Sequence, residues 1–262
     1  MKNFSPTNNE RRYTAYVGSL NTTQLHKQNP YIVAWWSAAM PGFGHILLSK
    51  HLRGIILFAW EIIINVMSKL NLAMVYSFNG EMDMAKQVIE PKWILMYIPV
   101  YIFTIWDSYR STVDMNKQFL LAETENAPFP TFSINALEIN HLEQKIPFMA
   151  TLWSLLTPGL GQLYIHRVML AFICILWFII FVIFSDVLIA IHHLFLGQIN
   201  EATDVLDPQW FMFFPSLIFF SMYDAYVHAV ENNKLYKHVQ RNVLKEDYQA
   251  THVHFPRPEG GG

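Results

Sequence analysis

Apolar residues along this chain are gathered into six stretches, three in each half, separated by short polar segments. The first stretch covers 31–48 and 146–165, the second runs from about 54 to 76 and from 168 to about 193, and the third begins at Trp93 and at Trp210. A helix of about 23 residues reaches roughly 34 Å, enough to cross a hydrocarbon core of about 30 Å. The pattern therefore predicts an all-α integral membrane protein whose helices satisfy their own backbone groups inside lipid.

The two halves repeat each other at a constant offset of 117 residues. Laying 36–117 over 153–234 without a gap pairs 22 identical residues in 82 positions, many of them Pro, Gly, Trp or Asp. Such an internal repeat indicates one supersecondary unit used twice. The domains expected are a polar N-terminus (1–30), a first membrane unit (31–119), an acidic linker with one short helix (120–145), a second membrane unit (146–236) and a polar tail (237–262).

The first stretch of each unit is interrupted by Pro-Gly-x-Gly, which breaks a helix because proline lacks a donor and glycine is too permissive. If these segments enter the membrane and return, the chain has four spans and 15 of its 18 Lys and Arg residues lie on the cytoplasmic side. If they cross, there are six spans and the division is 13 to 5. The positive-inside rule favours four spans plus two broken or re-entrant helices, with both termini cytoplasmic. The residues that form the breaks are Pro41, Gly42 and Gly44 in the first unit and Pro158, Gly159 and Gly161 in the second.

Two further patterns concern the third stretch of each unit. Residues 81–90 and 198–207 are predicted to form short amphipathic helices that end before Pro91 and Pro208. Pro99 and Pro215 lie in the middle of the third stretches, so a kink is expected in each helix.

Composition agrees with a membrane protein and narrows the possible functions. The chain is 53% hydrophobic and only 15% charged, whereas soluble domains average about 25% charged. Its net charge of −2 gives no reason to expect a nucleic-acid partner. The single Cys174 excludes an intrachain disulfide.

The sequence Pro158-Gly159-Leu160-Gly161-Gln162-Leu163-Tyr164, followed by His166-Arg167, resembles a family of small two-span membrane domains. That family is marked by a Gly-x-Gly turn, a His or Gln, an aromatic residue and a basic residue that opens the next helix. The first unit keeps His45 but has Leu47 where the pattern has tyrosine. The duplicated unit also resembles an extra membrane region found beside bacterial sugar ABC permeases. This resemblance implies a location in the cytoplasmic (inner) membrane and an accessory role, but no established reaction.

Asp107 and Asp224 are retained at the cytoplasmic ends of the third stretches, and each is followed two residues later by a tyrosine, Tyr109 or Tyr226. The break leaves backbone N–H groups unpaired at the start of the next helix. Two partners are expected for them. One is an internal cap or docking contact made by these aspartates, with Arg110 as an i,i+3 partner of Asp107. The other is a lipid phosphate held with the help of Lys50, Arg53 and Arg167.

Glu61 is the only carboxylate inside the second stretch of the first unit, and its counterpart is Phe178. An intramembrane carboxylate is costly and is by default a candidate for function. Asn65 and His45 are expected as its neighbours. The two interpretations are structural pairing and a proton or cation pathway.

The sequence contains no repeated or clustered set of catalytic side chains, and no cofactor or metal is expected. We therefore expect a non-catalytic accessory or scaffold protein that packs against another membrane complex, for which a bacterial ABC transporter is the named candidate. The alternatives are a small transporter or channel with its site near Glu61, and a protein that binds anionic lipids. The oligomeric state is left open. Because the halves differ at Glu61/Phe178 and His45/Gln162, function is expected where the copies differ.

Overall fold

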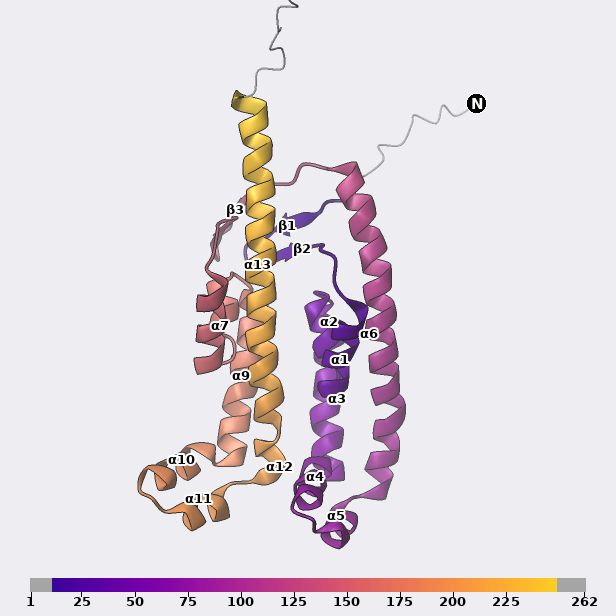
Figure 1. Cartoon of the computed structure of the whole chain (residues 1–262), viewed down its shortest axis with the longest axis vertical. Coiled ribbons are helices and arrows are strands. Elements are labelled where there is room, and N and C mark those ends of the chain that lie inside the picture. The colour runs from indigo at the N-terminus through magenta and orange to yellow at the C-terminus, as the bar shows by residue number, and fades with distance from the viewer. Residues whose placement is uncertain (1–10, 249–262) are drawn as a thin grey trace, which may run out of the picture.

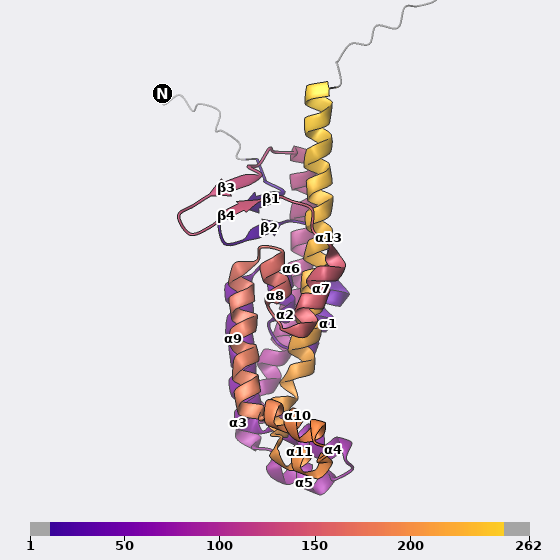
Figure 2. The same cartoon turned by 90° about the vertical axis from the view of Figure 1, so that its left-hand side faces the viewer.

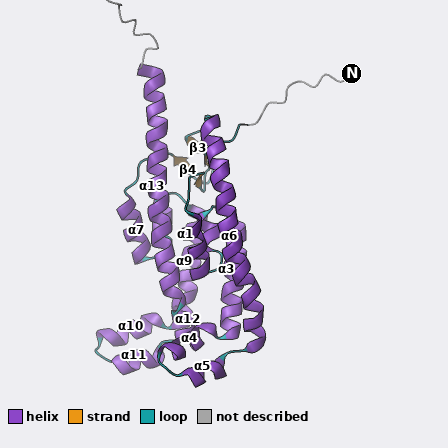
Figure 3. Cartoon of the chain, turned by 45° about the vertical axis from the view of Figure 1, so that its right-hand side comes forward, coloured by secondary structure: helices purple, strands orange, loops and turns teal. Residues whose placement is uncertain are grey.

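The computed structural model describes residues 11–248, and these residues form helices and two small β-hairpins (Figures 1 and 3). The first half contains β1 (Ala15–Val17), β2 (Thr22–Gln24), α1 (Pro30–Ala39), α2 (Phe43–Leu47), α3 (His51–Ser68), α4 (Leu70–Phe78), α5 (Met82–Val88) and α6 (Pro91–Glu125). The second half contains β3 (Phe132–Ile134), β4 (Ile139–His141), α7 (Pro147–Leu156), α8 (Leu160–Tyr164), α9 (Val168–Ser185), α10 (Val187–Phe195), α11 (Ile199–Val205), α12 (Pro208–Phe211) and α13 (Phe213–Tyr248).

The elements follow the 117-residue offset closely. Pro30 and Pro147 open α1 and α7, and His51 and Val168 open α3 and α9. The correspondence extends beyond the apolar stretches, because β1 and β3 begin at Ala15 and Phe132, also 117 positions apart.

The prediction of one short helix in the linker is wrong. Residues 132–141 form an antiparallel hairpin in which Phe132 pairs with His141 and Ile134 with Ile139. The alternation of apolar and polar residues in Phe132-Ser133-Ile134 suits a strand, and Asn135 at the turn suits a change of direction. The polar N-terminus contains the equivalent hairpin, β1–β2.

In each broken helix pair, the end of the second helix lies beside the start of the first. Gln28, just before α1, donates from Nε2 to the carbonyl oxygen of Leu47 at the end of α2 (3.1 Å). In the second half the backbone N–H of Ile146 lies 3.2 Å from Oη of Tyr164, at the end of α8. Each first helix has 10 residues, a length of about 15 Å. Such helices are too short to cross a bilayer, so α1–α2 and α7–α8 each fold back as a pair of helices. We call them the re-entrant pairs.

The prediction that each second stretch forms a single helix of about 23 residues is wrong. α3 and α9 have 18 residues each, and a residue in the left-handed region separates them from α4 and α10. Those residues are Lys69 (φ 56°) and Asp186 (φ 53°). A non-glycine residue at positive φ ends a helix because the following backbone cannot continue its hydrogen-bond pattern.

Among residues 11–248, three helical segments are long and apolar enough to cross a membrane, namely His51–Ser68, Val168–Ser185 and Pro208–Lys245. The pair Met82–Val88 and Pro91–Glu125, bent by 90°, provides a fourth. Pro99 lies inside α6, which remains one helix of 35 residues. The chain is thus a multi-pass membrane protein by the length and composition of its helices. Helices α5 and α11 occur where short amphipathic helices were predicted.

The halves lie side by side with their equivalent ends in the same direction (Figure 1). The two β-hairpins lie beyond one end of α3 and α9, and the short helices α4, α5, α10 and α11 gather at the other end (Figure 2). Helix α13 lies between α7 and α9 of its own half and α1–α3 of the first half, whereas α6 lies at the outer side of the first half (Figure 1). One aromatic-rich core joins the halves, in which Phe43 stacks on Phe58 and Phe220, and Phe58 meets Trp177 edge to face.

Candidate functional site at the seam between the halves

Asp224 lies at the centre of a buried charged cluster in the second half. It forms an ion pair with Arg167, and both side chains are almost completely enclosed. Gln162 of α8 donates from Nε2 to the second carboxylate oxygen of Asp224 (3.2 Å). His228 Nδ1, one turn further along α13, lies 2.8 Å from Nη1 of Arg167 and 3.2 Å from Oδ1 of Asp224. The cluster ties the re-entrant pair and the start of α9 to the long helix α13.

Asp107 makes the equivalent cluster in the first half with a different cation. His45 of α2 lies 3.0 Å from Asp107 through Nε2, and Arg53 of α3 donates to the same oxygen at 2.7 Å. Lys50, at the position equivalent to Arg167, instead donates to Ser111 (2.8 Å). Each half therefore holds its re-entrant pair through one aspartate, although the cation comes from a different turn of the helix.

These contacts show how the expected capping and lipid-binding residues are used. The partners of both aspartates are side chains rather than the backbone N–H groups of the following helix. The three proposed lipid-phosphate cations, Lys50, Arg53 and Arg167, all face protein groups. Arg110, expected beside Asp107, lies 3.8 Å from Asp114 instead.

Tyrosines 109 and 226 do not join the aspartate clusters. The ring of Tyr109 meets that of Tyr31 edge to face at 5.4 Å, and the side chain of Tyr226 is half exposed.

The Pro-Gly-x-Gly turns lie between the two helices of each re-entrant pair. Gly42 and Gly159 adopt φ values of 99° and 110°, which glycine accepts without steric cost. A Cβ atom on Gly44 would overlap the Ser37 hydroxyl and the carbonyl oxygen of Val33. Pro41 and Pro158 are buried beside them, and Gly161 repeats the close approach of Gly44 against Ser154. The turn residues thus allow α2 and α8 to pack directly on the helices they follow.

Glu61 belongs to a polar network within the apolar layer. Its Oε1 accepts from Asn65 Nδ2 (3.1 Å) and from Tyr97 Oη (3.3 Å). Its Oε2 is buried and has no hydrogen-bond partner among residues 11–248. His45, expected nearby, is used by Asp107 instead.

The network continues across the seam through Gln209 of α12. Gln209 Nε2 donates to Asn65 Oδ1 (2.9 Å), and its Oε1 accepts from the backbone N–H of Leu72 (2.9 Å). Asn71 donates to the Gln209 carbonyl oxygen (3.0 Å). These bonds link α3 and α4 of one half to α12 of the other.

The second half has no such network, because apolar residues replace its members. Phe178, Val182 and Leu188 are the counterparts of Glu61, Asn65 and Asn71, and Phe214 is that of Tyr97. They line an apolar cavity of about 480 Å³ beside α9, α10 and α13. The polar insertion is therefore specific to the seam between the halves.

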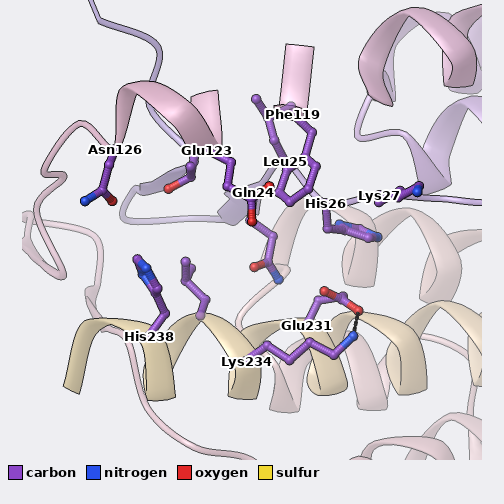
Figure 4. A pocket seen from close by; sticks show the side chains of 12 residues that line it. Gln24, Leu25, His26, Lys27, Phe119, Glu123, Asn126, Glu231, Lys234 and His238 are labelled. Carbon is purple, nitrogen blue, oxygen red and sulfur yellow. Dashed lines mark hydrogen bonds and ion pairs between the residues drawn. The ribbon is translucent and has the colours of Figure 1, made fainter. Parts of the chain in front are cut away.

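A second cavity, of about 320 Å³, lies where the ends of α6 and α13 meet the N-terminal hairpin (Figure 4). Phe119 and Glu123 line it from α6, Lys234 and His238 from α13, and His26 from the loop after β2. Burial, assisted by the nearby His228 and Arg167, lowers the pKa of His26 to about 3. His26 is consequently neutral at pH 7.

The hairpin β3–β4 carries an exposed apolar face. Asn140 is buried and donates to the carbonyl oxygen of Gly18 (2.7 Å) in the other hairpin. Because side chains alternate along a strand, the opposite face points away from that contact. We call this opposite face the apolar hairpin face; its exposed members are Phe132, Ile134 and Ile139, together with Leu137 of the turn.

Comparisons with protein-family models, with curated proteins and with solved structures gave no match. The described residues also contain no group of three or more His, Cys, Asp or Glu side chains that could hold a metal ion.

Several residues at the seam were not singled out by the sequence. Gln209, Asn71 and Tyr97 are polar residues within or beside apolar stretches, and each has an apolar or charged counterpart 117 positions away. That difference between the copies is the signal that could have found them. The hydrogen bond from Gln24 to Asn232 (2.8 Å) joins two residues that lie outside the apolar stretches, so the apolar pattern carried no signal for it.

Proposed function

We propose that this chain is a non-catalytic accessory or scaffold protein of the cytoplasmic membrane, built from two tandem homologous units that dock onto another membrane protein. The observation that carries the proposal is the apolar hairpin face. Ile134 is 70% exposed, whereas its counterpart Val17 is 3% exposed. Large apolar patches on a protein surface mark interaction sites.

Lipid tails do not account for this face. The hairpins lie beyond the end of α9 at which Arg167 precedes the apolar helix (Figure 2). Apolar side chains along α9 are exposed as any lipid-facing residue would be, but Phe132 and Ile139 lie outside that layer. A protein partner is the occupant that would remove them from water.

The supporting feature inside each unit is rigidity. The Asp224 and Asp107 clusters hold each re-entrant pair on its long helix, and α6 and α13 run without interruption from the apolar layer to the hairpins. A continuous helix presents the hairpins at a fixed height above the membrane. This is the property that a docking scaffold needs.

Affinity purification from native membranes in mild detergent, followed by native mass spectrometry, tests the proposal. We expect a stoichiometric complex for the wild type, and its loss for the triple variant Phe132→Ser, Ile134→Ser, Ile139→Ser. An ABC permease is the first partner to look for. The matched control is Tyr16→Ser, an exposed substitution on the other hairpin. A wild-type chain that purifies alone would contradict the proposal.

The membrane orientation is part of the proposal. We place both termini on the cytoplasmic side, with four spans formed by α3, α6, α9 and α12–α13. The return of both re-entrant pairs and the distribution of Lys and Arg support this topology. In a chain with Cys174→Ala, His51→Cys should react with an impermeant maleimide from the cytoplasmic side and Glu81→Cys from the outside. Six spans would reverse both results.

A second candidate function, proton or cation transport, is supported by the unpartnered Oε2 of Glu61. It predicts that the purified chain in proteoliposomes carries a flux that Glu61→Gln abolishes. Flux that is absent, or unchanged by the substitution, would leave Glu61 with a structural role alone.

A further inference from the structure

The contact between the halves is heterologous, because each half contributes a different surface. The first half contributes what we call its front surface, and the second half contributes what we call its back surface, on α13 (Figure 1). Trp36 packs on Phe220 and Tyr223, His26 meets His228, and Gln24 bonds to Asn232. The front surface of the first half is Gln24, His26, Trp36 and Phe43, and the back surface of the second half is Phe220, Tyr223, His228 and Asn232.

The repeat supplies each half with both surfaces, so one of each stays unused. The front surface of the second half is His141, Glu143, Trp153 and Leu160. The back surface of the first half is Phe103, Trp106 and Met115, while Ser111, the counterpart of His228, is buried and accepts a hydrogen bond from Lys50 of its own half. Trp153 is 41% exposed where Trp36 is 6% exposed. Phe103 is 48% exposed where Phe220 is 1% exposed. The two unused surfaces lie on opposite sides of the molecule.

Charge favours joining these two surfaces. Inside the chain, His26 and Lys234 line the same cavity (Figure 4). The counterparts of this pair are Glu143 and Lys117, both with substantially exposed side chains. The same contact between two chains would place a carboxylate opposite an ammonium group, which steers association and fixes its register.

We propose that the partner docked on the second half is a second copy of this chain, bound head to tail through the unused front and back surfaces. The inference rests on the proposed scaffold function and names its partner. The apolar hairpin face continues into the front surface at His141, which pairs with Phe132 across the hairpin. Both halves point the same way in the membrane, so a copy added through this contact keeps that orientation. A heterologous contact repeated in this way closes into a ring or extends as a row in the membrane plane.

Thiol cross-linking in native membranes tests the contact directly. The side chains of Gln24 and Asn232 are joined at 2.8 Å, from Nε2 to Oδ1, within the chain, and their counterparts are His141 and Met115. One tagged chain carries His141→Cys and a second, differently sized chain carries Met115→Cys, both with Cys174→Ala. Because two side chains span this contact, a short bifunctional maleimide is used, and we expect a mixed dimer between the two chains. The positive control is Gln24→Cys with Asn232→Cys in one chain, which the same reagent should link internally.

Chains that carry His141→Cys alone should give no homodimer, because in a head-to-tail contact these positions lie far apart. Such a homodimer, or the lack of a mixed dimer when the positive control is linked, overturns the proposal. If the mixed dimer is missing but another protein co-purifies and is lost in the hairpin triple variant, only the head-to-tail inference fails. If the mixed dimer is missing and the chain also purifies without any other protein, both the head-to-tail inference and the scaffold function fail.

A charge exchange provides a second, independent test on exposed positions. Lys117→Glu should reduce the yield of mixed dimer several-fold, and combining it with Glu143→Lys on the other chain should restore it. A yield that is indifferent to both substitutions would contradict the proposed register.

Discussion

Arg167 and Asp224 form an ion pair that is enclosed on all sides, whereas the equivalent Asp107 pairs with Arg53, whose side chain is 51% exposed. The carboxylate thus keeps its place in both halves while the cation moves from the turn before the helix to its first turn. What the repeat preserves is the attachment of the re-entrant pair to the long helix. The individual ion pair is exchangeable.

Asp224→Asn should destabilise the protein more than Asp107→Asn. Removing one partner of a buried pair leaves an uncompensated charge on Arg167, at a cost of about 3–5 kcal/mol. Arg53 can turn to water and lose far less. Thermal unfolding in detergent measures the two variants side by side. Equal losses, or a larger loss at Asp107, would contradict this account.

Gln209→Ala should loosen the seam between the halves. It removes the acceptor for the Leu72 N–H and the donor to Asn65, which leaves buried polar groups unpaired at about 1–3 kcal/mol each. The matched control is Lys92→Ala, the equivalent and exposed position of the first half. Limited proteolysis and melting temperature should change for Gln209→Ala only.

Gly42→Ala should lower stability much more than Gly80→Ala. Both glycines have positive φ, at 99° and 83°, so both variants carry backbone strain of about 1 kcal/mol. Only at Gly42 would the added Cβ overlap another backbone, at Gly54 and Phe58 of α3. Fluorescence-detected unfolding separates the two effects, and a similar loss for both variants would mean that the close approach is unimportant.

His26 should make the folded state sensitive to acid. Its pKa is about 3 when folded and near 6.5 when unfolded, so between these values the unfolded chain binds the extra proton. The contribution of neutral His26 to the free energy of unfolding is therefore fully present above pH 6.5. It falls as the pH falls below 6.5, by at most about 1.4 kcal/mol per pH unit. Burial is the main cause of the lowered pKa, and the nearby His228, Arg167 and Lys234 add to it. The variant His26→Leu should show a shallower loss of melting temperature between pH 7 and pH 5 than the wild type.

The sequence predicted the features that depend on local pattern. The apolar stretches predicted helices long enough to cross a membrane, and the Pro-Gly-x-Gly turns predicted the breaks between α1 and α2 and between α7 and α8. The repeat predicted equivalent elements in both halves. Each of these signals lies within a few residues of the structure it specifies.

The sequence pattern missed short elements and helix ends that no periodic signal marks, and one contact between distant residues. The hairpins β1–β2 and β3–β4 have strands of three residues, too short to give a clear period. The ends of α3 and α9 at Lys69 and Asp186 interrupt a continuous apolar stretch, so hydropathy alone could not place them. His45 was expected at Glu61, but it binds Asp107 because α2 turns back toward the end of the bundle where α3 begins.

The most direct test of the central claim is the mass of the complex extracted from native membranes into lipid nanodiscs without chemical cross-linking. A scaffold with unused front and back surfaces predicts a defined assembly that contains at least two copies of the chain, reduced to single chains by the hairpin triple variant. A single chain without any protein partner, in the wild type and at the same concentration, would contradict the account.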